Sequence, residues 1–162
     1  IHAVTGSLQM FGANISMQKT ISWICMGFVC AHGIAGLILT IKTLNARRLS
    51  GAGYFKDNAL FWARRISGFA ILIPLVMHLL IFDPVNQGAY RLEVFTAGRM
   101  ISQILLAVLI ALHVLTNIKP ALISFGVRDL KAFTADILLI LSVVLLVCAA
   151  AFAVYFLRWT SL

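Results

Sequence analysis

Four histidines are the residues of this sequence best suited to chemistry: His2, His32, His78 and His113, each inside a separate apolar segment. An imidazole inside a membrane span is costly, so it usually marks function. Imidazole nitrogen suits haem iron, and two axial histidines leave the iron no open position for oxygen. One histidine on each of four helices is the number needed to ligate two haems, which predicts an electron-transfer protein.

Other interpretations of the histidines stay open at this point. A single histidine can equally hydrogen-bond a neighbouring helix. A zinc or di-metal site would need carboxylates or thiolates nearby, and the spans offer almost none. Asp136 lies near the start of the last apolar segment, where a helix N-terminus favours its charge. Cys25, Cys30 and Cys148 form no Cys-x-x-Cys pair, so any haem is expected to be held non-covalently.

The composition is that of an integral membrane protein. The chain is 62% hydrophobic and 11% charged, where a soluble domain carries roughly 25% charged residues. Its mean hydropathy is +1.01, and apolar runs of about 20 residues, each long enough to span a bilayer, recur along it. The net charge of +8 resides in short loops between these runs, so membrane topology accounts for it and no nucleic-acid partner is expected.

The expected fold is an all-α integral membrane helical bundle of five transmembrane helices, forming one domain over residues 1–162. The first apolar stretch, 1–11, would reach only ~17 Å as a helix. We therefore expect a first helix truncated at the start of the given sequence, ending at the turn Gly12-Ala13-Asn14. The other spans are expected at about 20–43, 59–82, 97–118 and 132–157. Asp83-Pro84 and Lys119-Pro120 are the expected stops of the third and fourth spans.

Charges in the connections predict the topology. The two basic connections, on one side, hold Lys42, Arg47, Arg48, Lys56, Arg64 and Arg65 against Asp57, and Lys119, Arg128 and Lys131 against Asp129. The other two hold Lys19 alone, and Arg91 and Arg99 balanced by Asp83 and Glu93. Basic loops favour the cytoplasm. The chain is thus expected to be multi-pass, with odd spans running outward and even spans inward.

This topology converts spacing into depth, at about 1.5 Å per residue. His2 and His78 fall in the outer half of the membrane. His32 falls near the middle and His113 toward the inner end. The depths therefore pair His2 with His78 around an outer haem, and His32 with His113 around an inner one.

Haem propionates are anionic and need basic or hydrogen-bonding partners near the interface. An inner haem or a quinone headgroup could be bound at the start of the third span by Trp62, Arg64, Arg65 and Ser67. Lys119 and Asn117 could also reach inner propionates, and Arg99 and Gln103 could reach outer ones. The arginines equally suit interfacial anchors. Glycines near the histidines, such as Gly36 and Gly68, would let a flat macrocycle approach, or simply let helices pack.

The order of the histidine-bearing spans, followed by a histidine-free last helix, resembles the di-haem cytochrome b subunit of menaquinone-linked succinate dehydrogenases and fumarate reductases. The matching stretches are Ile1-His2, Gly12-Ala13-Asn14, Ala31-His32, Trp62, Ser67-Gly68-Phe69-Ala70, His78-Leu79, Arg99-Met100-Ile101-Ser102 and Leu112-His113. The likeness covers nearly the whole chain. It implies the same ligand pairs, His2 with His78 and His32 with His113, and two haem b groups.

The resemblance also implies partners and a location. An iron–sulfur subunit and a flavoprotein subunit would dock on the cytoplasmic face, near the loop at 42–65, in a bacterial inner membrane. Electrons would pass between menaquinol or menaquinone, the outer haem, the inner haem, the iron–sulfur chain and flavin. Whether the complex forms a homodimer is left open. Two features depart from the pattern: Ala111 stands where some members carry a proton-transferring glutamate, and the 14–20 connection is short.

Two further classes stay open. Other di-haem cytochromes include the membrane subunits of hydrogenases and formate dehydrogenases and the ascorbate-reducing cytochromes, but these often place two histidines on one helix. A haem-free transporter or channel would be favoured by helices broken at paired glycines or prolines. Pro74 is the only proline within an expected span.

Overall fold

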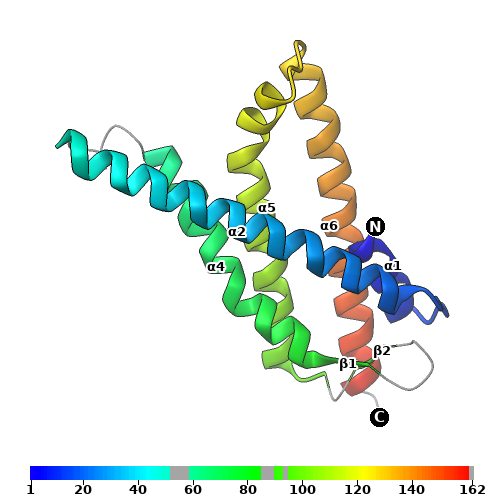
Figure 1. The fold of residues 1–162 in the computed structure, drawn as a ribbon. Helices are drawn as coiled ribbons and strands as arrows, with labels where there is room; N and C mark the ends of the chain where they lie inside the picture. Colours follow the sequence, from blue (N-terminus) through cyan, green and yellow to red (C-terminus); the bar gives the residue numbers. More distant parts are fainter. Residues whose placement is uncertain (52–58, 85–89, 93–94, 161–162) are drawn as a thin grey trace.

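The computed structural model describes residues 1–51, 59–84, 90–92 and 95–160. The helices are α1 (His2–Met10), α2 (Gln18–Ser50), α4 (Ala59–Ile81), α5 (Ala97–Ser124) and α6 (Leu130–Thr160), and the short strands are β1 (Phe82–Pro84) and β2 (Tyr90–Leu92) (Figure 1). The helical class is confirmed. Four helices, α2, α4, α5 and α6, are long and apolar enough to cross a membrane.

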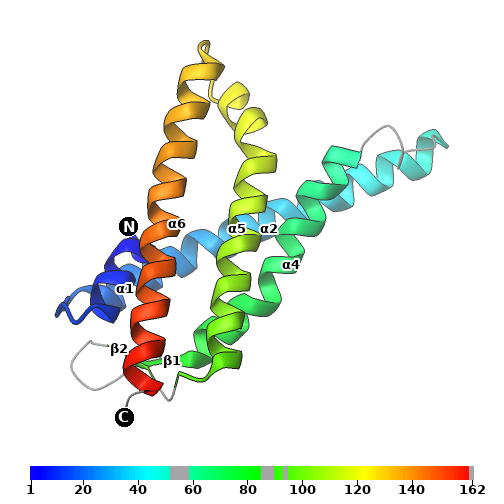
Figure 2. The ribbon, with the colours of Figure 1, turned by 180° about the vertical axis from the view of Figure 1, so that it is seen from behind.

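The helices pack around an antiparallel pair formed by α5 and α6. In both ribbon views this pair is joined at one end, α4 runs beside α5, and α2 lies across the other helices rather than alongside them (Figures 1 and 2). The most extensive packing joins α4 to α5, while α1 packs against α6. The α2 helix touches α4 only slightly, and the expected five-helix membrane bundle stays a prediction.

Local signals explain where the helices begin and end. The hydroxyl of Thr96 accepts a hydrogen bond from the Arg99 backbone N–H at 3.4 Å, which caps the start of α5. Helix α2 ends at Gly51, whose φ of 66° is left-handed and whose N–H donates to the Arg47 carbonyl at 3.2 Å. Glycine adopts this conformation without strain.

The prediction that the fourth span stops near Pro120 was wrong. Helix α5 continues through Pro120 to Ser124. Proline has no N–H, so the carbonyl of Thr116, four residues earlier, lacks its helical donor. The Nε of Arg64 donates to that carbonyl at 2.8 Å instead. A side chain of α4 therefore replaces the missing bond and also ties α4 to α5.

The connection after the third span is partly β-structure. Helix α4 ends at Ile81, and β1 pairs antiparallel with β2 in the register Phe82↔Leu92 and Asp83↔Arg91. The sequence predicted only a stop at Asp83-Pro84. Strand pairing satisfies the backbone polar groups of these residues. Lys56, Asp57 and Glu93, which enter the charge argument, lie outside the described residues.

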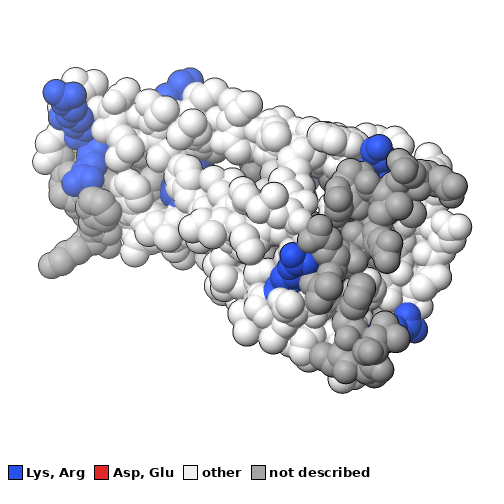
Figure 3. Space-filling model, turned by 90° about the horizontal axis from the view of Figure 1, so that it is seen from below, with Lys and Arg blue, Asp and Glu red and all other residues white. Residues whose placement is uncertain are grey.

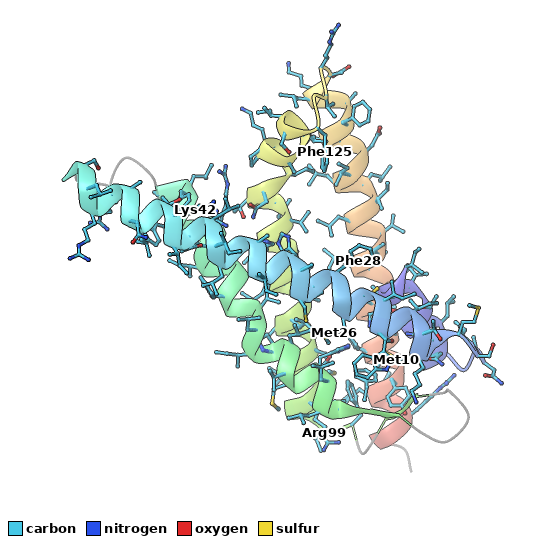
Figure 4. The ribbon with its side chains drawn as sticks, viewed as in Figure 1. Met10, Met26, Phe28, Lys42, Arg99 and Phe125 are labelled. Carbon is cyan, nitrogen blue, oxygen red and sulfur yellow. The ribbon has the colours of Figure 1, made fainter. Side chains whose placement is uncertain are left out.

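A compact core lies at this end of the molecule. It consists of Met10, Ile81, Phe95 and Ala151, from α1, α4, the segment before α5, and α6 (Figure 4). Phe95 is 1% exposed and meets the Tyr155 ring edge-on, with ring centroids 5.6 Å apart. Elsewhere large apolar side chains cover the outer surface, as lipid-facing helices require.

The membrane orientation predicted from the charges stays a prediction. The α5–α6 turn lies at the top of Figure 1 and the last turns of α2 at the upper left, whereas the α1–α2 turn and the strands lie lower on the right. In Figure 4, Phe125 marks the α5–α6 end, Lys42 lies toward the left on α2, and Arg99 marks the lower end. From below, basic side chains are separated by broad uncharged surface (Figure 3).

Candidate functional site

The four histidines come together as two facing pairs. The rings of His2 on α1 and His78 on α4 have centroids 6.0 Å apart, with planes at 88°. The rings of His32 on α2 and His113 on α5 have centroids 5.9 Å apart, with planes at 83°. These are the pairs that the depth argument put together. Iron ligation by them stays a prediction.

The spacing of each pair fits a single metal ion between two imidazoles. A metal–imidazole nitrogen bond is about 2.0–2.1 Å, and the ring centre lies about 1.1 Å beyond that nitrogen, so two axial rings have centres about 6 Å apart. The steep angle between the planes is allowed, because each ring can turn about its own metal–nitrogen bond. The same spacing also suits an edge-to-face contact between two rings, so the hydrogen bonds on each ring are needed to separate these possibilities.

The hydrogen bond of His78 identifies its tautomer. Its Nδ1 lies 2.6 Å from Oε1 of Gln103, a side chain that is 1% exposed. A carboxamide oxygen can only accept a hydrogen bond. Nδ1 of His78 therefore carries the proton, which leaves Nε2 with a free lone pair.

Two serines contact the Nδ1 atoms of His2 and His113. The hydroxyl of Ser22 lies 3.2 Å from Nδ1 of His2, and the hydroxyl of Ser67 lies 3.1 Å from Nδ1 of His113. Amide nitrogens lie near the same atoms: Nε2 of Gln18 is 3.3 Å from Nδ1 of His2, and Nδ2 of Asn117 is 3.5 Å from Nδ1 of His113. An amide N–H can only donate whereas a hydroxyl can also accept, so these contacts position both rings without selecting one tautomer.

This pattern favours metal ligation over ring packing. A metal-ligating histidine typically donates its other ring N–H to a neighbouring acceptor, which fixes the ring and strengthens the ligand. His78 has such an acceptor in Oε1 of Gln103, and serine hydroxyls contact Nδ1 of His2 and His113. An edge-to-face contact alone needs no acceptor there. His32 lies on the exposed surface of α2 and is held by its contact with His113.

Gly68 lets the His113 ring lie directly against α4. A Cβ at this position would be 3.2 Å from Cε1 of His113 and 3.5 Å from Nδ1. The first distance is shorter than an ordinary van der Waals contact. Gly68 and Ser67 thus set the place and the hydrogen bond of the same ring.

The two pairs lie at different levels along α4 and α5. Ser67, which holds His113, and His78 are about 11 residues apart on α4, or about 16 Å along the helix axis. Gln103, which holds His78, and His113 are about 10 residues apart on α5, or about 15 Å. Two metal centres so placed would form a short series through the apolar layer.

Arg64 and Arg65 differ in what they can bind. The Nε of Arg64 is committed to the Thr116 carbonyl. The Nε of Arg65 is buried and has no hydrogen-bond partner among the described residues, while its guanidinium lies 5.0 Å from the Phe61 ring centroid. Its Nη1 would be 3.9 Å from a Cβ at Gly36, one turn beyond His32. A carboxylate such as a propionate would satisfy this donor.

The remaining predicted residues have these positions. Ser67 and Gln103, expected near propionates, instead contact His113 and His78. Trp62 packs edge-on against Phe61 at 5.5 Å, Arg99 lies in the first turn of α5, and Lys119 is exposed near the opposite end of that helix.

Ser22 was missed by the sequence reasoning. It is a polar residue inside an apolar span and one turn after Gln18, whose Nε2 lies 3.3 Å from the same Nδ1 of His2. That spacing on one helix face could have identified it.

Protein ligands in the described ranges do not gather in groups of three or more. No such cluster of histidine, cysteine, aspartate or glutamate is found there. A zinc site built from protein side chains uses three or four ligands, whereas a haem iron takes two at most from the protein.

Comparison of the chain with protein-family models, curated proteins and solved structures finds no match. The functional interpretation therefore depends on the residues and their geometry.

Proposed function

We propose that this chain is the haem-bearing membrane anchor subunit of a fumarate reductase or succinate dehydrogenase complex. It would transfer electrons between menaquinol or menaquinone and an iron–sulfur subunit through two bis-histidine haem b groups. The observation that carries the proposal is the presence of two facing histidine pairs, 6.0 and 5.9 Å between ring centroids. The acceptor at Nδ1 of His78 leaves Nε2 of that ring available.

In this function, haem would supply a one-electron carrier, and the histidines of each pair would hold it. Gln103 holds the Nδ1–H tautomer of His78, so Nε2 of that ring is free to ligate. Ser22 and Ser67 position the rings of His2 and His113. Arg65 offers its unpaired donor to an anionic group beside the inner pair. The apolar helices exclude water around both levels.

The proposed partners follow the charge distribution and the family resemblance. The iron–sulfur and flavoprotein subunits would dock at the end of α2 that carries Lys42, Arg47 and Arg48. This end would face the cytoplasm of a bacterial inner membrane. The inner pair, His32 and His113, would be nearer to that side, and the outer pair nearer to the quinol that delivers or receives electrons.

The test is to purify the complex through this chain from its native membranes and follow the reduced b-type spectrum. The proposal expects succinate to reduce the haem and fumarate to reoxidise it. A matched sample carrying His32→Ala should retain only the outer haem. Reduction by hydrogen or formate, with no response to succinate, would assign the chain to another quinone-linked complex. A complex without haem would remove the cytochrome assignment and favour a transporter.

A further inference from the structure

Gln103 is a buried side chain that meets His78 through a short hydrogen bond. Its Oε1 lies 2.6 Å from Nδ1 of His78, and the side chain is 1% exposed. Its Nε2 donates to the hydroxyl of Ser102 at 3.1 Å, and that hydroxyl donates to the Arg99 carbonyl at 2.7 Å. The carboxamide is therefore held from its other end, with its oxygen aimed at the imidazole.

A hydrogen bond of this kind changes how strongly the imidazole binds a metal, in addition to holding the ring in position. When Nδ1–H donates to a strong acceptor, electron density rises on the ring, and Nε2 becomes a stronger donor to a metal. The effect grows in a water-poor interior, where hydrogen bonds are electrostatically stronger. A stronger donor stabilises the oxidised state of iron more than the reduced state, which lowers the reduction potential.

The other Nδ1 partners bind more weakly by geometry. The hydroxyl oxygens of Ser22 and Ser67 lie 3.2 and 3.1 Å from their histidines, at the long end of the usual 2.7–3.2 Å for an N–H···O bond. Each already donates its hydrogen to a carbonyl. His78 therefore has the shortest of these three bonds.

We infer that Gln103 is a positioning residue that fixes His78 as an Nδ1–H ligand and selectively lowers the reduction potential of the outer metal centre. This inference rests on the proposed haem function, but it concerns a separate property of the site. It gives Gln103 a role at the ligand rather than at a propionate.

The experiment is a spectroelectrochemical titration of the purified complex, comparing three variants with the wild type. Gln103→Leu removes the acceptor, Gln103→Glu keeps an acceptor oxygen at that position, and Ser102→Ala removes only the distal bond of the carboxamide. We expect Gln103→Leu to raise the outer midpoint by about 59 mV, a tenfold change in the one-electron equilibrium constant. The inner midpoint should not move, and Gln103→Glu should leave the outer midpoint unchanged or lower it. Ser102→Ala should raise the outer midpoint by less than Gln103→Leu does, because it loosens the carboxamide and keeps the acceptor oxygen.

The two midpoints are assigned with His32→Ala, which spares the outer pair. If Gln103→Leu keeps both haems and both midpoints, the inference is overturned while the proposed function stands. If Gln103→Leu loses the outer haem, the test depends on Gln103→Glu. The inference expects Gln103→Glu to keep the outer haem with an unchanged or lower midpoint, and a raised midpoint overturns it. A wild-type complex without haem overturns the proposed function and the inference together.

Discussion

Replacing Gly68 with alanine tests whether the His113 ring is held where the proposal needs it. A Cβ at this position would approach Cε1 of His113 to 3.2 Å and Nδ1 to 3.5 Å. The ring is also bonded to Ser67, the neighbouring residue. The added methyl group would therefore push the ring away from α4 and stretch its hydrogen bond to Ser67.

The expected free-energy effect of Gly68→Ala is the sum of two opposing contributions. Gly→Ala in a helix interior is favourable by about 1 kcal/mol, and overpacking at a tight contact costs about 1–3 kcal/mol. Gly27→Ala in the interior of α2 is the matched control, because nothing lies within 4 Å of its added Cβ. The helix term is shared, so the difference between the variants is about 1–3 kcal/mol. This corresponds to about a five- to 150-fold loss of inner haem affinity.

The assay is a titration of haem-depleted protein in detergent, followed by the low-spin absorption of the reduced form. Gly68→Ala should bind the outer haem normally and the inner haem at least several-fold more weakly than Gly27→Ala does. Equal affinities in the two variants would refute the claim that the close approach of His113 to α4 is needed. An equal loss of both haems would point instead to a general packing defect.

Three other predictions follow from the packing. Arg64→Leu should lower the free energy of unfolding by about 1.5–3 kcal/mol, and the loss should shrink in a Pro120→Ala background, because an alanine there restores the helical donor to the Thr116 carbonyl; a double-mutant cycle without coupling would contradict this. Arg65→Gln should lower the inner midpoint potential alone in a redox titration, since it removes a positive charge that opposes oxidation; a shift of the outer midpoint instead would be inconsistent with its place beside Gly36. Phe95→Ala should cost about 3–5 kcal/mol in thermal unfolding, and a loss below 1 kcal/mol would mean that the core at that end is not tightly packed.

Much of the helical layout could be predicted from hydropathy and from the glycine and proline residues that end helices. The expected third span and α4 share the start at Ala59 and differ by one residue at the end. The pairing of histidines could be anticipated because depth depends only on spacing and on the direction of each span. These are local properties of the chain, so they need no knowledge of packing.

Other features depend on contacts between helices and could not be predicted. Pro120 normally ends a helix, and only Arg64, arriving from α4, lets α5 continue. Gln103 and Ser67 look like interfacial polar residues in the sequence. Their contacts with His78 and His113 depend on the rotation of α5 and α4, which periodicity in a uniformly apolar helix does not determine.

Polar residues in the spans therefore carry more information than charge counts suggested. Ser22, Ser67 and Gln103 each meet a different histidine, and each comes from a helix other than that of its histidine. A search for hydroxyl or carboxamide groups at the depth of each imidazole would have identified them. His32 is exposed and has no such partner in the part of the chain that the structure describes, and its placement depends on α2 lying across α5.

The most direct test of the central claim is the haem content of the purified full chain in its complex, measured as the pyridine haemochrome. The account predicts two haem b groups per chain, both low-spin, with one lost in His113→Ala and the other lost in His78→Ala. A chain that holds no haem, or a histidine variant that keeps both, would contradict the assignment of these pairs as axial ligands.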